Sequence, residues 1–150
     1  MALTFRLRLA IESDLSSLAA IEQESFPDPS WTAPDFLRYD CTVAEVDVGL
    51  ETSEIAGFLV SRENFPGSAN CRPEREVLNL AVSARFRRSG IASGLLANEV
   101  GRRTDVFLEV RESNAPAIHL YKKAGFTVVA QRTDYYDNPI ESAIVMRLKW

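Results

Sequence analysis

A basic turn between a strand-like run and a helix-like run is the first candidate for chemistry in this chain. The apolar run 78–82 is typical of a buried strand, and apolar residues from Ile91 to Val100 recur at helical spacing. The turn carries Arg87, Arg88, Ser89 and Gly90. Because the first amides of a helix lack partners within it, such a turn can bind an anion such as a diphosphate. A solvated turn without a ligand is the simpler alternative.

The second candidate is Glu109, which lies near the end of the otherwise apolar run 105–110. Desolvating a carboxylate there costs on the order of several kcal/mol, so it needs a partner or a wet cleft. An ion pair with Arg111 or Arg75 is the structural explanation. A general base is the functional one.

Other kinds of site find little support. The lone His119 is expected on a solvated helix face, and without a His or Cys cluster no metal site is predicted. The serines near the turn lack a base at recognisable spacing, which argues against a serine hydrolase. The turn also lacks the lysine of a Walker loop and the further glycines of the dinucleotide fingerprint. Cys41 and Cys71 have no CxxC spacing and are expected to be reduced.

Length and composition predict a single domain over residues 1–150. The chain has 150 residues, 46% hydrophobic and 25% charged, with a net charge of −4. This mild acidity argues against nucleic acid as the main partner. No signal peptide or membrane-length apolar run is present, so we expect a cytoplasmic protein without a membrane partner.

The pattern of elements predicts an α/β domain with a mixed sheet. The predicted strands are 5–9, 43–48, 55–61, 75–82, 105–110, 126–130 and 143–148. The predicted helices begin at Ser13, Thr32, Gly90 and Asn114 and end near Ser25, Tyr39, Arg102 and Gly125. The predicted irregular segments are 26–30, a turn at 49–54, the loop 62–74 and a polar-aromatic loop at 133–139. The loop 62–74 is either a flexible flap or an ordinary surface loop. The order β α α β β β α β α β β implies a three-layer α/β architecture.

Two motifs resemble those of a known family. The spacing Arg87-x-x-Gly90-x-Ala92 resembles motif A of the GCN5-related N-acetyltransferases, the GNAT family. The run from Glu109 to Phe126 is similar to the C-terminal half of that family, and most similar to its RimI-type branch. That branch acetylates the N-terminal alanine of a small-subunit ribosomal protein. The likeness continues through Tyr135-Tyr136 and Glu141-Ser142-Ala143. A weaker similarity to the family lies near the N-terminus, in Ile21-Glu22-Gln23, Phe26, Pro27 and Trp31.

The resemblance implies a three-layer GNAT-like fold, with about seven strands and four helices, and acetyl-CoA as cosubstrate without a metal. It assigns Glu109 as the general base that takes a proton from the amine, directly or through water. It assigns Tyr121 as the acid that protonates the departing thiolate, since a phenol pKa near 10 suits that task. The implied cofactor-binding residues are Leu80, Ala81, Val82, Arg87, Arg88, Ser89, Gly90, Ile91, Ala92, Ser93 and Asn114.

Two of these assignments have structural alternatives, and the pantetheine site requires a change in the central strand. Core packing with a tethered hydroxyl is the alternative role of Tyr121, and helix capping is that of Asn114. The central strand is expected to splay near Asn79, where a bulge would make room for pantetheine.

The general base bears on the acceptor. At pH 7 an N-terminal amine is neutral in about a seventh of molecules, whereas a lysine amine is neutral in about one of 2,500. A single carboxylate therefore suits an α-amine, and the predicted acceptor is a peptide or protein N-terminus, possibly of a ribosomal protein. The identity of the acceptor peptide is left open by two departures from the RimI-type branch. One is Ser142, where the branch usually has an acidic residue, and the other is the long loop 62–74. A small-molecule amine acetyltransferase and a non-catalytic acyl-CoA-binding module are the alternatives, and a monomer or weak dimer is expected.

Overall fold

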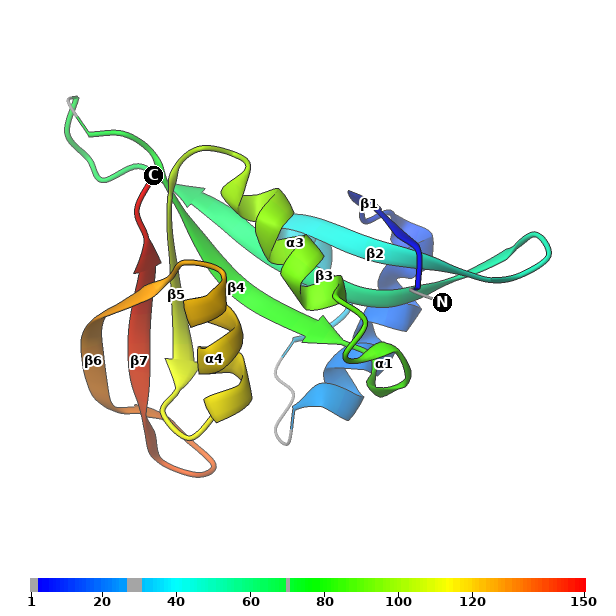
Figure 1. The fold of residues 1–150 in the computed structure, drawn as a ribbon. Helices are drawn as coiled ribbons and strands as arrows, with labels where there is room; N and C mark the ends of the chain where they lie inside the picture. Colours follow the sequence, from blue (N-terminus) through cyan, green and yellow to red (C-terminus); the bar gives the residue numbers. More distant parts are fainter. Residues whose placement is uncertain (1–2, 27–30, 70) are drawn as a thin grey trace. The chain divides into compact units, whose positions relative to one another are not determined.

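A computed structural model describes residues 3–26, 31–69 and 71–150 of the chain (Figure 1). Most of the irregular segment predicted at 26–30 lies outside the described residues, as does Pro27 of the N-terminal motif. The chain divides into two compact units. Unit 1 consists of Met1–Ser61 and Asn79–Leu96, and unit 2 of Arg62–Leu78 and Ala97–Trp150.

The order of strands and α-helices is the predicted one. The strands are β1 (Phe5–Leu9), β2 (Asp40–Gly49), β3 (Thr52–Asn64), β4 (Glu74–Val82), β5 (Asp105–Arg111), β6 (Thr127–Tyr136) and β7 (Glu141–Leu148). The α-helices are α1 (Leu15–Ser25), α2 (Asp35–Arg38), α3 (Ile91–Val100) and α4 (Ala115–Lys123), and the short 3-10 helices are η1 (Glu12–Asp14) and η2 (Ala84–Phe86). The strands follow the order β1-β2-β3-β4-β5-β7-β6. Because β4 and β5 pair in parallel and β5 and β7 antiparallel, the predicted mixed sheet is confirmed.

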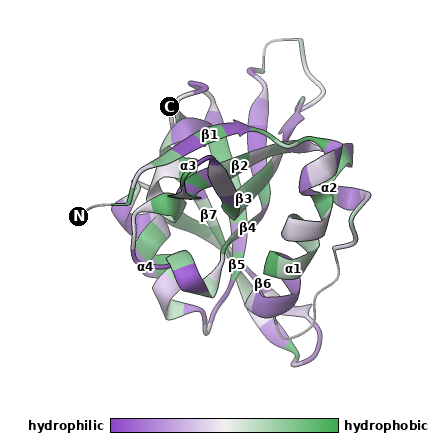
Figure 2. Cartoon of the chain, turned by 90° about the vertical axis from the view of Figure 1, so that its right-hand side faces the viewer, coloured by the Kyte–Doolittle hydropathy of each residue, from purple (hydrophilic) through white to green (hydrophobic). Residues whose placement is uncertain are grey.

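In unit 1, helices cover both faces of the sheet. Figures 1 and 2 show α1 on one face of strands β2 to β4 and the first turns of α3 on the other, with mostly hydrophobic residues along β3 between them. Leu18, Phe36 and Phe58 are fully buried. Helix α3 approaches β1 so closely that a Cβ on Gly94 would lie 2.7 Å from Cζ of Phe5. Only a glycine fits there without movement of the ring.

The start of the first helix differs from the prediction. Ser13 does not cap it. Asp14 instead accepts a hydrogen bond from the backbone amide of Ile11 at 2.9 Å and ion-pairs with Arg8, whose Nη1 lies 2.8 Å from Oδ2 of Asp14. The paired guanidinium lowers the pKa of Asp14. The Asp14 carboxylate thus caps the short 3-10 helix before α1, and it makes no side-chain capping bond to α1 itself.

In unit 2, α4 lies beside β5 (Figure 1). Alternate β5 residues Val106, Leu108 and Val110 are buried, and Glu109 lies on the opposite face of the strand. Unit 2 also contains a buried ion pair. Nε of Arg75 lies 2.6 Å from Oε1 of Glu99, and both side chains are buried.

Three predicted irregular segments are shorter than expected because strand pairing continues into them. Thr52 pairs with Gly49, which leaves only residues 50–51 as the turn between β2 and β3. Strand β6 runs on to Tyr136, which pairs with Glu141, so residues 133–136 are strand rather than loop. The loop after β3 spans 65–73, because Arg62 and Asn64 hydrogen-bond to Glu76 of β4.

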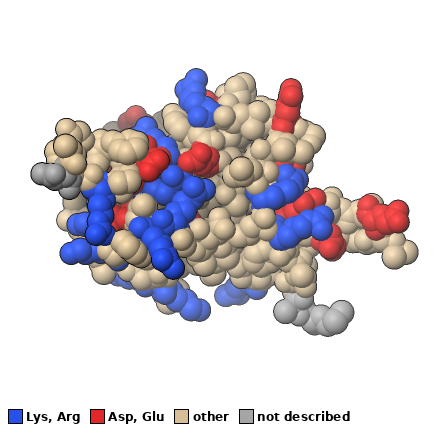
Figure 3. Space-filling model, turned by 90° about the horizontal axis from the view of Figure 1, so that it is seen from above, with Lys and Arg blue, Asp and Glu red and all other residues tan. Residues whose placement is uncertain are grey.

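Three further features concern the surface charges, the cysteines and the lengths of the helices. On the face shown in Figure 3, most acidic side chains lie beside basic ones. Cys41 and Cys71 are free thiols, as predicted. Within the described ranges, no helix is long and apolar enough to cross a bilayer.

Candidate active site

The basic turn of unit 1 is a fixed backbone structure. Gly90 has φ 82° and Arg88 has φ 61°, both in the left-handed region. A Cβ on Gly90 would meet open space, so glycine serves the backbone conformation there rather than packing. The turn is fixed by its own hydrogen bonds: Oγ of Ser89 donates to the carbonyl of Phe86, and Nε of Arg87 donates to the carbonyl of Val82 at 3.1 Å.

The turn leads directly into the first amides of α3. The amide of Gly94 donates to the carbonyl of Gly90 at 2.9 Å, and the amides of Ile91, Ala92 and Ser93 precede it. Amides at these positions lack carbonyl partners within a helix. Ile91 is 1% exposed and anchors the helix start in the core, whereas Gly90 and Ser93 are exposed. The start of α3 therefore leaves several amide donors without partners inside the helix, as binding of a diphosphate requires.

The strand segment before the turn extends beyond the parallel ladder. The parallel ladder of β4 and β5 joins Glu74–Val77 to Asp105–Leu108, whereas β4 continues through Leu80, Ala81 and Val82. The ladder thus ends two residues before Asn79, where the splay was predicted. No register shift occurs along this ladder, and the bulge near Asn79 stays a prediction.

Glu109 pairs with an arginine other than the two named in its structural explanation. Its Oε1 lies 2.8 Å from Nε of Arg132 on β6. Arg111 pairs instead with Glu141 at 3.4 Å, and Arg75 pairs with Glu99. Arg111 and Arg75 each pair with another carboxylate, and strand order, which the sequence does not reveal, brings Arg132 to Glu109.

Two tyrosines at the end of β6 complete the surroundings of Glu109. A hydrogen bond with Glu109 raises the pKa of Tyr135. Burial, followed by the charge of Glu109, raises the pKa of Tyr136 to about 12. The guanidinium of Arg111 lies 4.4 Å from the ring centroid of Tyr136. Glu109 is therefore surrounded by phenols that stay protonated at neutral pH.

Tyr121 is buried in α4. Its ring centroid lies 6.0 Å from that of Phe126, and its side chain packs in the core of the unit. Burial, with a smaller contribution from Tyr136, raises the pKa of Tyr121 to about 12, which is above the value near 10 that we expected. Tyr136 thus interacts electrostatically with both Glu109 and Tyr121.

Asn114 adopts the simpler of its two roles. It is the N-cap of α4, and its side chain accepts a hydrogen bond from the amide of Ala117 at 3.3 Å. Pro116 follows in the first turn of the helix, as predicted. The side chain is exposed, and its contact with a cofactor stays a prediction.

The structure thus gathers the predicted site residues into two groups, one in each unit. Unit 1 contains residues 80–82 and 87–93, and unit 2 contains Glu109, Asn114 and Tyr121. Arg132, Tyr135 and Tyr136 were absent from the predicted site. The pair Tyr135-Tyr136 was visible in the sequence as part of the family likeness, but its assignment to a loop concealed its position on β6.

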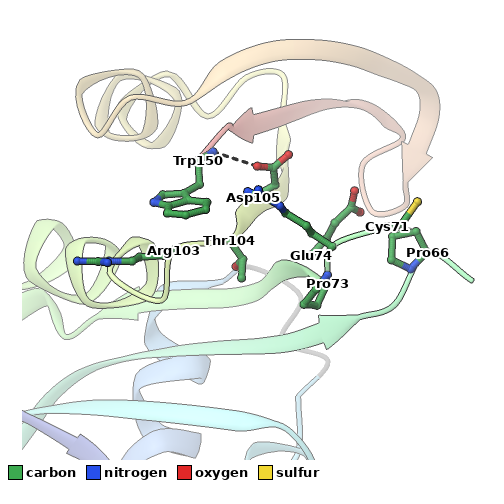
Figure 4. Close-up of a pocket in the computed structure, with 9 residues that line it drawn as sticks. Pro66, Cys71, Pro73, Glu74, Arg103, Thr104, Asp105 and Trp150 are labelled. Carbon is green, nitrogen blue, oxygen red and sulfur yellow. Dashed lines mark hydrogen bonds between the residues drawn. The ribbon is translucent and has the colours of Figure 1, made fainter. Parts of the chain in front are cut away.

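Two cavities are lined by residues outside these groups. One, of about 360 Å³, is lined by the 65–73 loop, Arg103 to Asp105 and Trp150 in unit 2 (Figure 4). The other, of about 500 Å³, lies in unit 1 beside α1 and η1. No predicted site residue lines either of the two. His119 is exposed, as predicted, and the described residues contain no group of three or more potential metal ligands.

Comparison with known proteins identifies the family. A sequence model of the Acetyltransferase (GNAT) family matches residues 15–126. An N-alpha-acetyltransferase of Sulfurisphaera tokodaii is 33% identical over 149 residues, which cover 88% of this chain and 86% of the relative.

Solved structures agree in fold. The ribosomal-protein-S18-alanine N-acetyltransferase from Escherichia coli superposes with a TM-score of 0.77 at 27% identity, covering 97% of this chain and 93% of that one. Arabidopsis thaliana NAA60 in complex with acetyl-CoA superposes with a TM-score of 0.84 at 22% identity, covering 98% of this chain and 100% of that one. The chain belongs to the GNAT family of acetyltransferases.

Proposed function

We propose that this protein transfers the acetyl group of acetyl-CoA to the N-terminal α-amine of a peptide or protein, with the N-terminal alanine of a ribosomal protein as the first candidate acceptor. The observation that carries the acceptor class is the relative named N-alpha-acetyltransferase, with 33% identity over 88% of the chain. The likeness to the ribosomal-protein enzyme supports the candidate acceptor.

In this proposal the backbone of unit 1 binds acetyl-CoA. The amides of Ile91, Ala92 and Ser93 at the start of α3 receive the diphosphate, and Arg87 and Arg88 add positive charge beside them. Hydrogen bonds of this kind, to a charged group, contribute about 1.5–3 kcal/mol each. The backbone of Leu80 to Val82 pairs with the pantetheine arm, and an amide there polarises the thioester carbonyl. Asn114 contributes a side-chain contact.

Glu109 acts as the general base. It takes a proton from the α-ammonium, directly or through one water, and the neutral amine then attacks the thioester carbonyl. Tyr135, which is hydrogen-bonded to Glu109, and Tyr136, which is only electrostatically coupled to it, both remain protonated beside this carboxylate. They therefore do not compete with Glu109 as bases.

Tyr121 acts on the leaving group. Because its pKa is about 12, Tyr121 carries its proton throughout the neutral range. A thiol has a pKa of about 8.5, so the departing thiolate needs stabilisation by a donor more than complete protonation. The phenol supplies that hydrogen bond and shares its proton with the sulfur.

The experiment is an acceptor comparison. The purified chain is incubated with acetyl-CoA and one of three acceptors: a peptide with the ribosomal alanine N-terminus, the same peptide with a blocked α-amine and a free lysine, and a panel of polyamines and aminoglycosides. Release of free thiol with only the first acceptor supports the proposal. Release with only the panel contradicts it in favour of a small-molecule enzyme. Stabilisation by acetyl-CoA without release from any acceptor indicates a binding module.

A further inference from the structure

One arginine in unit 2 touches the proposed base but has no part in the proposed chemistry. Nε of Arg132 lies 2.8 Å from Oε1 of Glu109, and the side chain of Arg132 is 57% exposed whereas that of Glu109 is 19% exposed. The guanidinium also lies 5.7 Å from the ring centroid of Tyr135. Glu109 and the ring thus fix one part of the guanidinium, while much of the side chain reaches solvent.

Nearby cations have other partners. Arg111 pairs with Glu141 and donates to the carbonyl of Asp137 at 2.9 Å. Arg147 pairs with Asp105. Arg132 is the cation that both pairs with Glu109 and keeps much of its side chain exposed.

An acceptor amine arrives mostly as an ammonium at neutral pH. Near Glu109 this ammonium competes with Arg132 for one carboxylate, and the two cations repel each other. A second negative group, supplied by the acceptor itself, would leave every charge with a partner. Guanidinium groups suit this exchange because they bind carboxylates through two parallel hydrogen bonds.

We propose that Arg132 determines acceptor specificity by favouring peptides whose second residue is Asp or Glu. This inference rests on the proposed function. The α-ammonium pairs with Glu109 while the acidic side chain of the next residue pairs with Arg132. Consecutive Cα atoms lie 3.8 Å apart, so the amine and the neighbouring carboxylate of one peptide can reach two side chains that are themselves in contact.

The test uses three peptides that begin with alanine and differ only at the second residue, which is Asp, Asn or Lys. Thiol release gives kcat/KM for each. The wild-type chain is expected to prefer Asp over Lys by about tenfold, with Asn between them. Arg132→Gln should bring the Asp/Lys ratio close to one, and Arg132→Glu should invert it. Added salt should weaken the wild-type preference, because it screens exposed charges.

The matched control is Lys123→Gln, which removes one positive charge from an exposed position at the end of α4 in the same unit. It should leave the Asp/Lys ratio at the wild-type value, and thermal unfolding of each variant checks that it is folded. If Arg132→Gln keeps the wild-type ratio, or if Lys123→Gln loses it equally, the inference is overturned while the proposed function stands. If the wild-type chain acetylates none of the three peptides, the proposed function fails and the inference fails with it.

Discussion

The turn 87–93 and the surroundings of Glu109 recognise their partners in different ways. The turn offers backbone amides at the start of α3, and its side chains mainly hold the backbone in place, as Ser89 does through Phe86. Glu109 is surrounded by side chains: Arg132 in an ion pair and Tyr135 in a hydrogen bond. Backbone donors suit a cosubstrate that is always the same molecule, whereas side chains can differ between enzymes that act on different acceptors.

The largest expected effect comes from Glu109→Gln. Gln keeps the shape of the side chain but cannot take a proton, so kcat should fall by about 10²–10⁴-fold. Binding of acetyl-CoA, measured by calorimetry, should be retained, because the turn 87–93 supplies its donors separately. Weakened acetyl-CoA binding with unchanged kcat would contradict the division of roles.

Tyr121→Phe should reduce kcat by about tenfold, less than loss of the base, because a thiolate is a stable leaving group near neutral pH. The pKa of Tyr121 is raised to about 12, so the phenol loses its proton only as the pH approaches that value. The ratio of wild-type to variant rates should therefore be constant between pH 6 and 9. A ratio that falls steeply within that range would show that the phenol is not the proton donor.

Gly90→Ala should act on the cosubstrate alone. Gly90 has φ 82°, and a Cβ there meets open space, so the cost is conformational, about 1–2 kcal/mol. The KM for acetyl-CoA should rise by roughly five- to thirtyfold if the whole cost falls on binding, with the KM for the peptide unchanged.

Gly67 provides a matched control for this substitution. It also has φ 82° and open space at its Cβ, but it lies in the 65–73 loop of unit 2. Gly67→Ala should carry the same backbone strain and leave both KM values unchanged. Equal effects of the two substitutions on the KM for acetyl-CoA would contradict the proposal that the turn 87–93 binds acetyl-CoA.

The smallest effect on turnover is expected from Asp14→Asn, which should change stability only. Arg8 lowers the pKa of Asp14, so this carboxylate stabilises the fold above its unfolded pKa, and the stabilisation is lost as the pH falls through the folded pKa. The variant should lose about 1–3 kcal/mol of unfolding free energy at pH 7, and the difference from wild type should shrink at acidic pH.

Urea unfolding at several pH values measures this difference. The control is Asp35→Asn, because Asp35 bonds to the amide and hydroxyl of Thr32 at the exposed start of α2 and should contribute less. A constant difference across the whole pH range would contradict the role of the Asp14 charge.

The same contrast explains what the sequence could reveal. The turn was predictable because its parts are consecutive: a strand, arginines, Gly90 and a helix, each with a local signature. The element order was predictable for the same reason. The partner of Glu109 was not, because Arg132 is 23 positions away and meets Glu109 only through the strand order β5-β7-β6. The length of β6 was likewise hidden, since pairing with β7 overrides the turn-like residues 133–136.

The most direct test of the account locates the acetyl group on the product. A peptide with a free α-amine and an internal lysine is incubated with acetyl-CoA and either the wild-type chain or Glu109→Gln, and fragmentation in the mass spectrometer identifies the modified nitrogen. The account predicts one acetyl group on the α-amine with the wild-type chain and almost none with Glu109→Gln. Acetylation of the lysine, or an undiminished rate in the variant, would contradict it.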